Sequence, residues 1–377
     1  MSPNWAAFAR PLTASGPAGL TARTGSHYRK VARAFLARHR RALVRAVAGG
    51  ESVWQRWQAA PSDWTVDWHR SVGALAADVD STNAARSWCE FLIHLNENGY
   101  RGRWTAKFRQ PVTLAVGDGV RADVATVRAH PSGRIELACS TERRRGCIVA
   151  RERIHRPSMR WRGSTVRFLT QPDIAALNGD RIGACTGDEE LDDQWIWNFA
   201  AAAQLLDDCA PSYGRWVRRV VRHVVVMTPM ARCTMSSSDA LASGVVRMSL
   251  SHDPVTIAEL MVHEATHGYF HLLENAGPIE DGSDPTLYYS PFKRQIRPIR
   301  AILLAFHAFA NIVFFYRLLL ESGARIDRRA VQEASGEVER QLDTLREPLL
   351  QTPALTERGI AVRDELFEQL GSRRTVA

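Results

Sequence analysis

The sequence predicts an α+β protein that is mainly helical, with a small β-rich unit in its N-terminal half and a helical domain in its C-terminal half. Apolar residues recur at helical spacing through most of residues 191–377. Between residues 111 and 170 the pattern changes to short alternating segments separated by Gly, Asp and Pro, which is typical of strands. The chain has 377 residues, of which 45% are hydrophobic, so it can bury a sizeable core in two or three domains.

We divide the chain into three parts. Residues 1–100 form a basic helical region, with an amphipathic helix over residues 27–47 and a second helix over residues 83–98. Residues 101–190 form the β-rich unit, and residues 191–377 form the helical domain. The strands expected in the β-rich unit are the segments 112–116, 125–127, 134–137 and 165–169.

The third part begins with helices and two strands. Residues 223–227 are apolar and β-branched, as in a buried strand, and residues 244–250 alternate in polarity just before the next helix. That helix has an N-cap at Asp253, a proline in its first turn, and a stop signal at Gly277. The other helices are expected at residues 193–208, 213–222, 301–316, 327–350 and 355–370.

The most apolar run, residues 301–316, is shorter than a bilayer span and is interrupted by His307 and Asn311. We therefore expect a buried core helix and no membrane contact. Polar side chains in such a helix are costly unless they have partners, which makes His307 a residue of interest.

Charge is distributed unevenly along the chain. Lys and Arg exceed Asp and Glu by 16 in residues 1–170, whereas residues 171–377 carry a balance of −7. Such a basic part is either a solvated face or a surface that receives an acidic peptide. Because no nucleic-acid-binding motif accompanies it, we expect no nucleic-acid partner.

Cysteine usage and the N-terminus indicate a cytoplasmic protein. The six cysteines form no C-x-x-C pair, which fits reduced thiols rather than a disulfide framework. Residues 1–20 lack the basic start and continuous apolar stretch of a secretory signal.

The capped helix contains the H-E-x-x-H pattern His263-Glu264-Ala265-Thr266-His267. At four-residue spacing both imidazoles project from one helix face a turn apart, so they can hold one divalent metal with Glu264 beside it. The alternative is a pair of histidines that are satisfied by hydrogen bonds in a core. The pattern predicts a metalloenzyme.

Two imidazoles do not complete a catalytic site, because such a metal normally takes three protein ligands. His271 continues the same stripe, but it lies about 12 Å from His263 along the helix axis, which is too far to share one ion. We expect it to have a packing or orienting role. The candidates for the third ligand are Glu274, Glu280, Asp281, Asp284 and His307.

The motif is compatible with two chemistries. In a zinc peptidase, Glu264 would be the general base that acts on metal-bound water. In an iron oxygenase, the same helix would hold Fe(II) with open positions for a keto acid and O₂. The motif by itself leaves both open.

The surroundings of the motif are similar to a known family. A serine-rich loop and a strand precede the motif, and Tyr288-Tyr289-Ser290-Pro291-Phe292, Arg297-Pro298-Ile299-Arg300 and an apolar helix follow it. In this order they resemble the HExxH-containing peptide-modification family. That family is described as Fe(II)- and 2-oxoglutarate-dependent peptide β-hydroxylases acting on ribosomally made natural-product precursors. The resemblance covers about the last 140 residues, including a segment at 355–359.

The resemblance implies roles for individual residues. His263 and His267 would be iron ligands, and Arg297 or Arg300 would hold the distal carboxylate of 2-oxoglutarate, a task that suits the bidentate guanidinium. For both arginines the alternative is a structural salt bridge. Tyr288 and Tyr289 would line the substrate pocket or anchor the loop.

The chain departs from the family pattern at two positions. The family usually has a histidine at the position closest to Leu304, and here His307, three residues later, is the expected substitute as third ligand. Lys293 stands where an arginine is usual, which keeps the charge but loses bidentate geometry. The resemblance implies hydroxylation of a side-chain β-carbon in a peptide or carrier-bound amino acid, and a cytoplasmic zinc metallopeptidase is the alternative.

Overall fold

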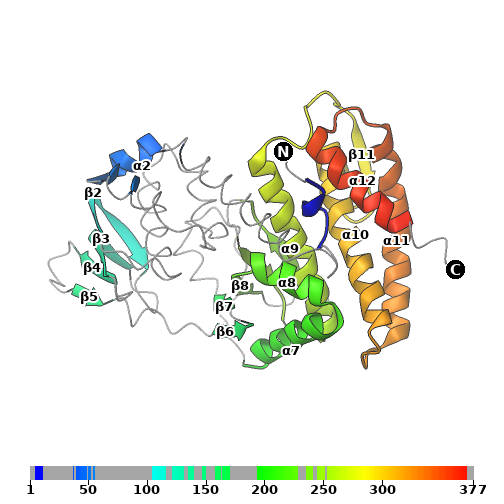
Figure 1. The fold of residues 1–377 in the computed structure, drawn as a ribbon, viewed down its shortest axis with the longest axis horizontal. Helices are drawn as coiled ribbons and strands as arrows, with labels where there is room; N and C mark the ends of the chain where they lie inside the picture. The colour runs from blue at the N-terminus through cyan, green and yellow to red at the C-terminus, as the bar shows by residue number, and fades with distance from the viewer. Residues whose placement is uncertain are drawn as a thin grey trace.

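The computed structural model describes residues 5–11, 37, 40–48, 50–51, 54–55, 104–115, 121–130, 135–139, 147–149, 158–162, 164–169, 193–227, 235–240, 244–250 and 253–371. Helices and small sheets are mixed among them (Figure 1), which confirms the predicted mixture of helix and strand. The helix expected over residues 83–98 lies outside the described residues. Of the helix expected over residues 27–47, the structure describes α2 (Arg40–Ala46).

The first sheet is antiparallel and has the strand order β1-β2-β3-β4-β5. In β2 and β3, buried apolar residues such as Phe108 and Val127 alternate with exposed or half-buried neighbours, so one face of the sheet is covered. In Figure 1 it lies at the opposite end of the view from helices α9–α12. Its strands are β1 (Val47–Ala48), β2 (Trp104–Ala115), β3 (Arg121–Ala129), β4 (Ile135–Cys139) and β5 (Cys147–Val149).

The second sheet has the order β6-β7-β8-β10-β9. Strands β7, β8 and β10 are parallel, and the two outer strands run antiparallel to them. The central strand β8 is apolar and buried, so it requires neighbours on both edges. The bounds are β6 (Ser158–Trp161), β7 (Ser164–Leu169), β8 (His223–Val226), β9 (Ser236–Ser238) and β10 (Val245–Met248).

This sheet differs from the sequence prediction in two ways. Strands β6 and β7, assigned to the unit of residues 101–190, pair with strands that follow residue 191, so the sheet extends across that boundary. Strand β9 was expected to be a polar loop, which is wrong. Its three serines have no apolar alternation that would reveal a strand, and only its pairing with β10 makes it one.

The helices surround one continuous apolar core. Helix α9 packs against α7 and α8 on one side and against α10 on the other, while α10 also contacts α11 and α12 (Figure 1). All six helices were predicted, with ends that shift by a few residues. Their bounds are α7 (Asp193–Cys209), α8 (Pro211–Val220), α9 (Pro254–Ala276), α10 (Ile299–Glu321), α11 (Arg328–Gln351) and α12 (Glu357–Gly371).

Helix α10 is long and apolar enough to cross a membrane by length and composition, but 72% of its most apolar window is buried inside the protein. It contacts α9, α11 and α12, and its polar residues His307 and Asn311 are both buried with hydrogen-bond partners. This is the arrangement of a core helix, as expected from the sequence.

Two further elements bring distant parts of the chain onto this core. The hairpin of β11 (Leu287–Ser290) and β12 (Gln295–Pro298) packs on α10 and α11. It was not predicted as a pair of strands. A short 3₁₀ helix, η1 (Trp5–Phe8), lies against α9 and α12, so the start of the chain belongs to the C-terminal helical part.

Gly214 in α8 gives a first testable prediction. A Cβ at this position would lie 2.5 Å from Oδ1 of Asp207, whose carboxylate accepts a hydrogen bond from Trp161. We expect Gly214→Ala to destabilise the protein by about 1–3 kcal/mol, because the buried carboxylate must move. The matched control is Gly336→Ala in the middle of α11, where the nearest atom is the end of the flexible Arg340 side chain at 3.7 Å. That variant should gain about 0.5–1 kcal/mol in urea unfolding, and equal effects of the two substitutions would contradict the packing described here.

Candidate metal centre

Helix α9 presents the motif because its sequence fixes both of its ends. The Asp253 carboxylate accepts hydrogen bonds from the backbone N–H groups of Val255 (2.9 Å) and Thr256 (3.2 Å), and Pro254 occupies the first turn. At the other end Gly277 has a φ of 149°, a conformation that favours glycine. The predicted caps are therefore confirmed.

His263 and His267 lie together on one face of α9. Their ring centroids are 4.5 Å apart, with an angle of 84° between the planes. Burial lowers the pKa of the His263 imidazole, and the positive charge of Lys293 lowers it further, against the opposing charge of Glu264. Burial also holds the pKa of His267 well below its usual value, and the charges of His263, His271, His307 and Lys293 act in the same direction. Both imidazoles are therefore neutral near pH 7, which is the form that binds a metal.

One nitrogen of the pair has no partner. Nδ1 of His267 is buried and makes no hydrogen bond to the residues that the structure describes. A buried nitrogen without a partner costs free energy, so such groups in a native protein call for an explanation. A bound cation would supply the missing partner if this nitrogen carries the lone pair.

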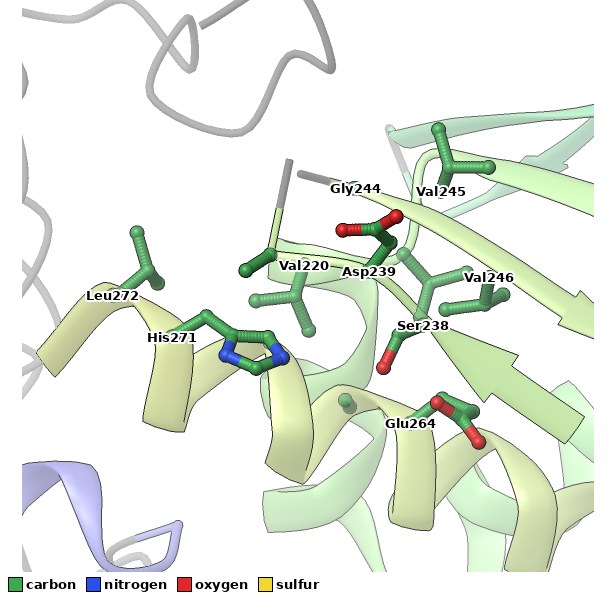
Figure 2. Close-up of a pocket in the computed structure, with 13 residues that line it drawn as sticks. Val220, Ser238, Asp239, Gly244, Val245, Val246, Glu264, His271 and Leu272 are labelled. Atoms are coloured by element: carbon green, nitrogen blue, oxygen red, sulfur yellow. The ribbon is translucent and has the colours of Figure 1, made fainter. Parts of the chain in front are cut away.

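Glu264 is 2% exposed, and its Oε2 is buried without a hydrogen-bond partner in the described part of the chain. It lines a pocket between α9 and the edge of the second sheet, together with Ser238, Asp239 and His271. Figure 2 shows the Ser238 hydroxyl pointing from β9 towards the helix that carries Glu264. The Ser238 hydroxyl oxygen is also buried, and no described residue bonds it. The pocket therefore contains two polar atoms without a hydrogen-bond partner among the described residues, although neither His263 nor His267 lines it.

His307 lies near enough for its charge to lower the pKa of His267, but it does not form a metal-binding group with the histidine pair among the described residues. It is buried, its Nε2 lies 2.8 Å from the backbone carbonyl oxygen of Ala9, and its ring packs against Trp216 and Phe270. Burial lowers its pKa to about 4, although the carbonyls of Phe8 and Ala9 oppose this effect. Within the described ranges, no three His, Cys, Asp or Glu side chains are placed to hold a metal ion. The expected role of His307 as third ligand is therefore not supported by this arrangement, because its surroundings are those of a core residue.

The other candidates for the third ligand have partners of their own. The Glu274 carboxylate binds Arg300 and the Nδ1 of His271. Asp284 accepts hydrogen bonds from the hydroxyls of Tyr288 and Thr352, each at 2.7 Å. The two remaining acidic side chains of the loop, Glu280 and Asp281, accept backbone N–H groups of their own turns.

The two arginines expected to bind a carboxylate differ in the structure. Arg300 donates from Nε and Nη2 to Glu274, with the second bond at 2.7 Å, which is the salt bridge that the sequence left open as the alternative. Arg297 on β12 is paired in register with Tyr288, and its guanidinium makes no hydrogen bond or ion pair with the described residues. Of the two, only Arg297 has a guanidinium without a partner among the described residues.

The two tyrosines lie on opposite faces of the hairpin. Tyr288 packs partly against the core and donates its hydroxyl to Asp284, so it anchors the loop. Tyr289 is 52% exposed and shares a face with Leu287 and Ile296, which are also exposed. Tyr289 is therefore free to contact a ligand, but neither tyrosine lines the pocket beside Glu264.

The turn of the hairpin packs on Phe309 of α10, which in turn contacts His263, and sequence reasoning missed this packing. The ring of Phe292 stacks on Phe309 of α10 at 3.4 Å, and Phe309 meets the edge of His263 at 5.1 Å. The positive charge of the next residue, Lys293, makes a small contribution that lowers the pKa of both imidazoles. No spacing rule links residue 292 to residue 309, so this proximity could not be read from the sequence.

Comparison with known proteins adds no identification. No family model matches the chain, and no curated protein matches it. The geometry of the described residues is therefore what bears on the function.

Proposed function

We propose that the chain is an Fe(II)- and 2-oxoglutarate-dependent oxygenase that hydroxylates a side-chain β-carbon of a peptide or carrier-bound amino acid in natural-product biosynthesis. The observation that carries the proposal is the neutral pair His263 and His267, one turn apart on a capped helix, with a buried nitrogen that none of the described residues bonds. The choice of iron, 2-oxoglutarate and a β-carbon rests on the resemblance described above.

The donor set fits a divalent ion at two of its positions. Imidazole is a ligand for both Fe(II) and Zn(II), and neutral rings need lose no proton to bind. Other positions would remain for the co-substrate and water. When bound, an Fe(II) ion would supply the chemistry that activates O₂, with 2-oxoglutarate as the electron donor.

The residues around the pair have supporting roles in this proposal. The unpartnered Oε2 of Glu264 accepts a hydrogen bond from water or from a substrate amide in the pocket that it shares with Ser238. Phe292 and Phe309 keep one side of His263 apolar, which excludes water there. Tyr289, exposed on the hairpin, is available to contact the substrate.

A cytoplasmic zinc metallopeptidase is the second candidate. It is favoured by one observation, the buried carboxylate of Glu264 with an oxygen that has no partner, next to the histidine pair. In that reading Glu264 takes a proton from water held at the pair and passes it to the leaving amine. The substrate would again be a peptide.

The domain assignment follows from the same proposal. We place the chemistry in the helical C-terminal part, residues 191–377, with strands β6 and β7 completing its sheet. The basic residues 1–100 and the first sheet are then available to bind the peptide or carrier. We also propose a cytoplasmic location.

The two candidate functions are separated by one experiment. Metal-free protein is loaded anaerobically with Fe(II), mixed with 2-oxoglutarate and exposed to air, and succinate is measured without a peptide, as uncoupled turnover. We expect succinate from the wild type and none from the His263→Ala, His267→Ala double variant. Chelator-sensitive cleavage of casein by zinc-loaded protein, without succinate formation by the iron-loaded protein, would overturn the oxygenase proposal in favour of the peptidase.

A further inference from the structure

The pocket between α9 and the edge of the second sheet is a cavity that neither histidine of the pair lines. Ser238 and Asp239 line it from the sheet, and Glu264 and His271 line it from the helix. In Figure 2 the Ser238 hydroxyl and the His271 ring face the space between sheet and helix. The volume of the pocket is about 20 Å³, slightly more than the roughly 10–15 Å³ that one water-sized group requires. The pocket therefore has room for one small polar group.

The carboxylate of Glu264 is buried in this pocket without a counter-charge. The residue is 2% exposed, and no described residue forms a hydrogen bond or an ion pair with its Oε2. Buried carboxylates are rare in proteins unless a cation pairs with them. Asp239 brings a second carboxylate to the same pocket, and no lysine or arginine of the described part of the chain lines it. The charges of the pocket therefore favour a cation.

The polar groups of the pocket can act as acceptors. Nδ1 of His271 lies 3.1 Å from a carboxylate oxygen of Glu274. Because a carboxylate only accepts, Nδ1 carries the proton of the neutral ring, and Nε2 is left with a lone pair. The hydroxyl oxygen of Ser238 is buried, is not bonded by any described residue and can accept as well. A ligand that satisfies these groups must bring donors, and a primary ammonium group brings three.

Other occupants of the pocket fit these observations less well. Among the side chains that the structure describes, no set of three or more His, Cys, Asp and Glu residues could hold a metal ion. A water molecule would satisfy the acceptors but would leave the carboxylates without a counter-charge. The apolar walls of the pocket, which include Val220, Val246 and Leu272, suit the methylene stem of an alkyl amine.

We propose that this pocket binds a primary ammonium group, with Oε2 of Glu264 as the charged acceptor and the Ser238 hydroxyl as a second acceptor. The proposal rests on the proposed function only where it names a peptide as the carrier of the ammonium group. On a peptide substrate, this group is a lysine side chain or the amino terminus. Its binding would attach the substrate to the helix that carries the histidine pair, so that the pocket selects peptides with an ammonium group near the residue to be modified.

Ligand-observed NMR titration of the full-length protein tests the site. The protein is kept free of metal, so that no amine can bind a metal ion. The ligands are pentylammonium and 1-pentanol, which have the same alkyl chain and differ in the head group. We expect the wild type to bind pentylammonium at least about tenfold more tightly than 1-pentanol, as one charge-assisted hydrogen bond requires. Glu264→Gln should remove this preference and change the binding of 1-pentanol by less than about twofold.

Two further variants accompany Glu264→Gln. Ser238→Ala should weaken pentylammonium by about threefold, the effect of one neutral hydrogen bond, and it tests the site independently if Glu264→Gln does not fold. Glu333→Gln removes the same charge from the exposed surface of α11, where Glu333 pairs with Arg329, and should leave both dissociation constants unchanged. Thermal denaturation shows whether each variant is folded.

Three short peptides distinguish the two sources of the ammonium group. Acetyl-Ala-Lys-Ala-amide carries it on a side chain, Ala-Ala-Ala-amide carries it at the amino terminus, and acetyl-Ala-Ala-Ala-amide has none. Each peptide is added to the protein with bound pentylammonium. We expect the lysine peptide to displace pentylammonium, because its stem matches the apolar walls, and the acetylated alanine peptide to have no effect. Displacement by Ala-Ala-Ala-amide alone would assign the site to an amino terminus.

The outcomes separate this site from the proposed function. Equal affinity of the wild type for pentylammonium and 1-pentanol would overturn the ammonium site, as would a Glu264→Gln variant that binds like Glu333→Gln. If pentylammonium binds but no peptide displaces it, the link to a peptide substrate is wrong. The titrations contain neither iron nor a keto acid, so the succinate assay can fail while the ammonium site holds, and the reverse.

Discussion

Replacing His263 or His267 by alanine is expected to abolish stoichiometric metal binding. Each substitution removes one of the two imidazoles that the structure places together, and a metal held by a single side chain is not retained. The expected loss of Fe(II) or Zn(II) affinity is at least about a hundredfold, since even residues that only orient a ligand cost 10–100-fold. Calorimetric titration of metal-free protein measures it.

His271→Ala is the matched control for these variants. His271 lies on the same stripe of α9, but its Nδ1 is 3.1 Å from the carboxylate of Glu274, and its ring centroid is 6.5 Å from that of His267. This variant should keep one equivalent of metal. If all three variants bind metal equally, the histidine pair is not a metal site and is instead part of the core.

Acidification is expected to destabilise the protein through His307. The pKa of this buried imidazole is about 4 in the folded chain, against about 6.5 for an unfolded histidine. The unfolded state binds the proton first, so the contribution of His307 is fully present above pH 6.5 and is lost as the pH falls towards 4. The loss should reach about 3 kcal/mol by pH 4, as linkage requires for a shift of this size.

His307→Gln isolates this effect from other titrating groups. Glutamine can still donate to the carbonyl of Ala9, as Asn311 does at 2.8 Å, but it does not titrate. Urea unfolding between pH 7 and pH 4 should show a shallower decline for the variant than for the wild type. The variant should also keep its metal. Parallel pH profiles, or loss of metal, would mean that His307 is not the buried core residue described here.

Local signals were enough to predict the helix that carries the motif. Asp253, Pro254 and Gly277 act through neighbouring backbone groups, so their effect can be read from adjacent residues. The same holds for the apolar periodicity of α10 and for the strand β8, whose existence needed no knowledge of the rest of the fold. The pairing of β7 with β8 could not be predicted, because more than fifty residues separate the two strands along the chain.

His307 shows which part of the site could not be predicted from the sequence. Sequence spacing placed His307 on α10 near the position expected of a ligand. The sequence also identified His307 correctly as a polar residue in an apolar helix. Its hydrogen-bond partner is the backbone carbonyl of Ala9, almost 300 positions away, and no local sequence pattern predicts such a contact. The segment around Phe8 fills this part of the core, and Asn311 donates to the same carbonyl.

The cationic side chains show the same limit. Arg300 was a good candidate because guanidinium binds carboxylates, and it does bind one, but the carboxylate belongs to Glu274. Lys293 drew attention only as a departure from a family pattern. Its position in the turn depends on the stacking of Phe292 on Phe309, a tertiary contact between the hairpin and α10.

The central claim is that His263 and His267 together hold one metal ion. X-ray absorption spectroscopy of the protein loaded with one equivalent of Fe(II) tests it most directly, because the outer-shell scattering of imidazole rings reports how many histidines bind. We predict two imidazole nitrogens at about 2.0–2.2 Å, as is usual for nitrogen ligands of divalent metals. A spectrum without imidazole scattering would contradict a metal site at the pair, and one with three imidazoles would contradict the placement of His307 in the core.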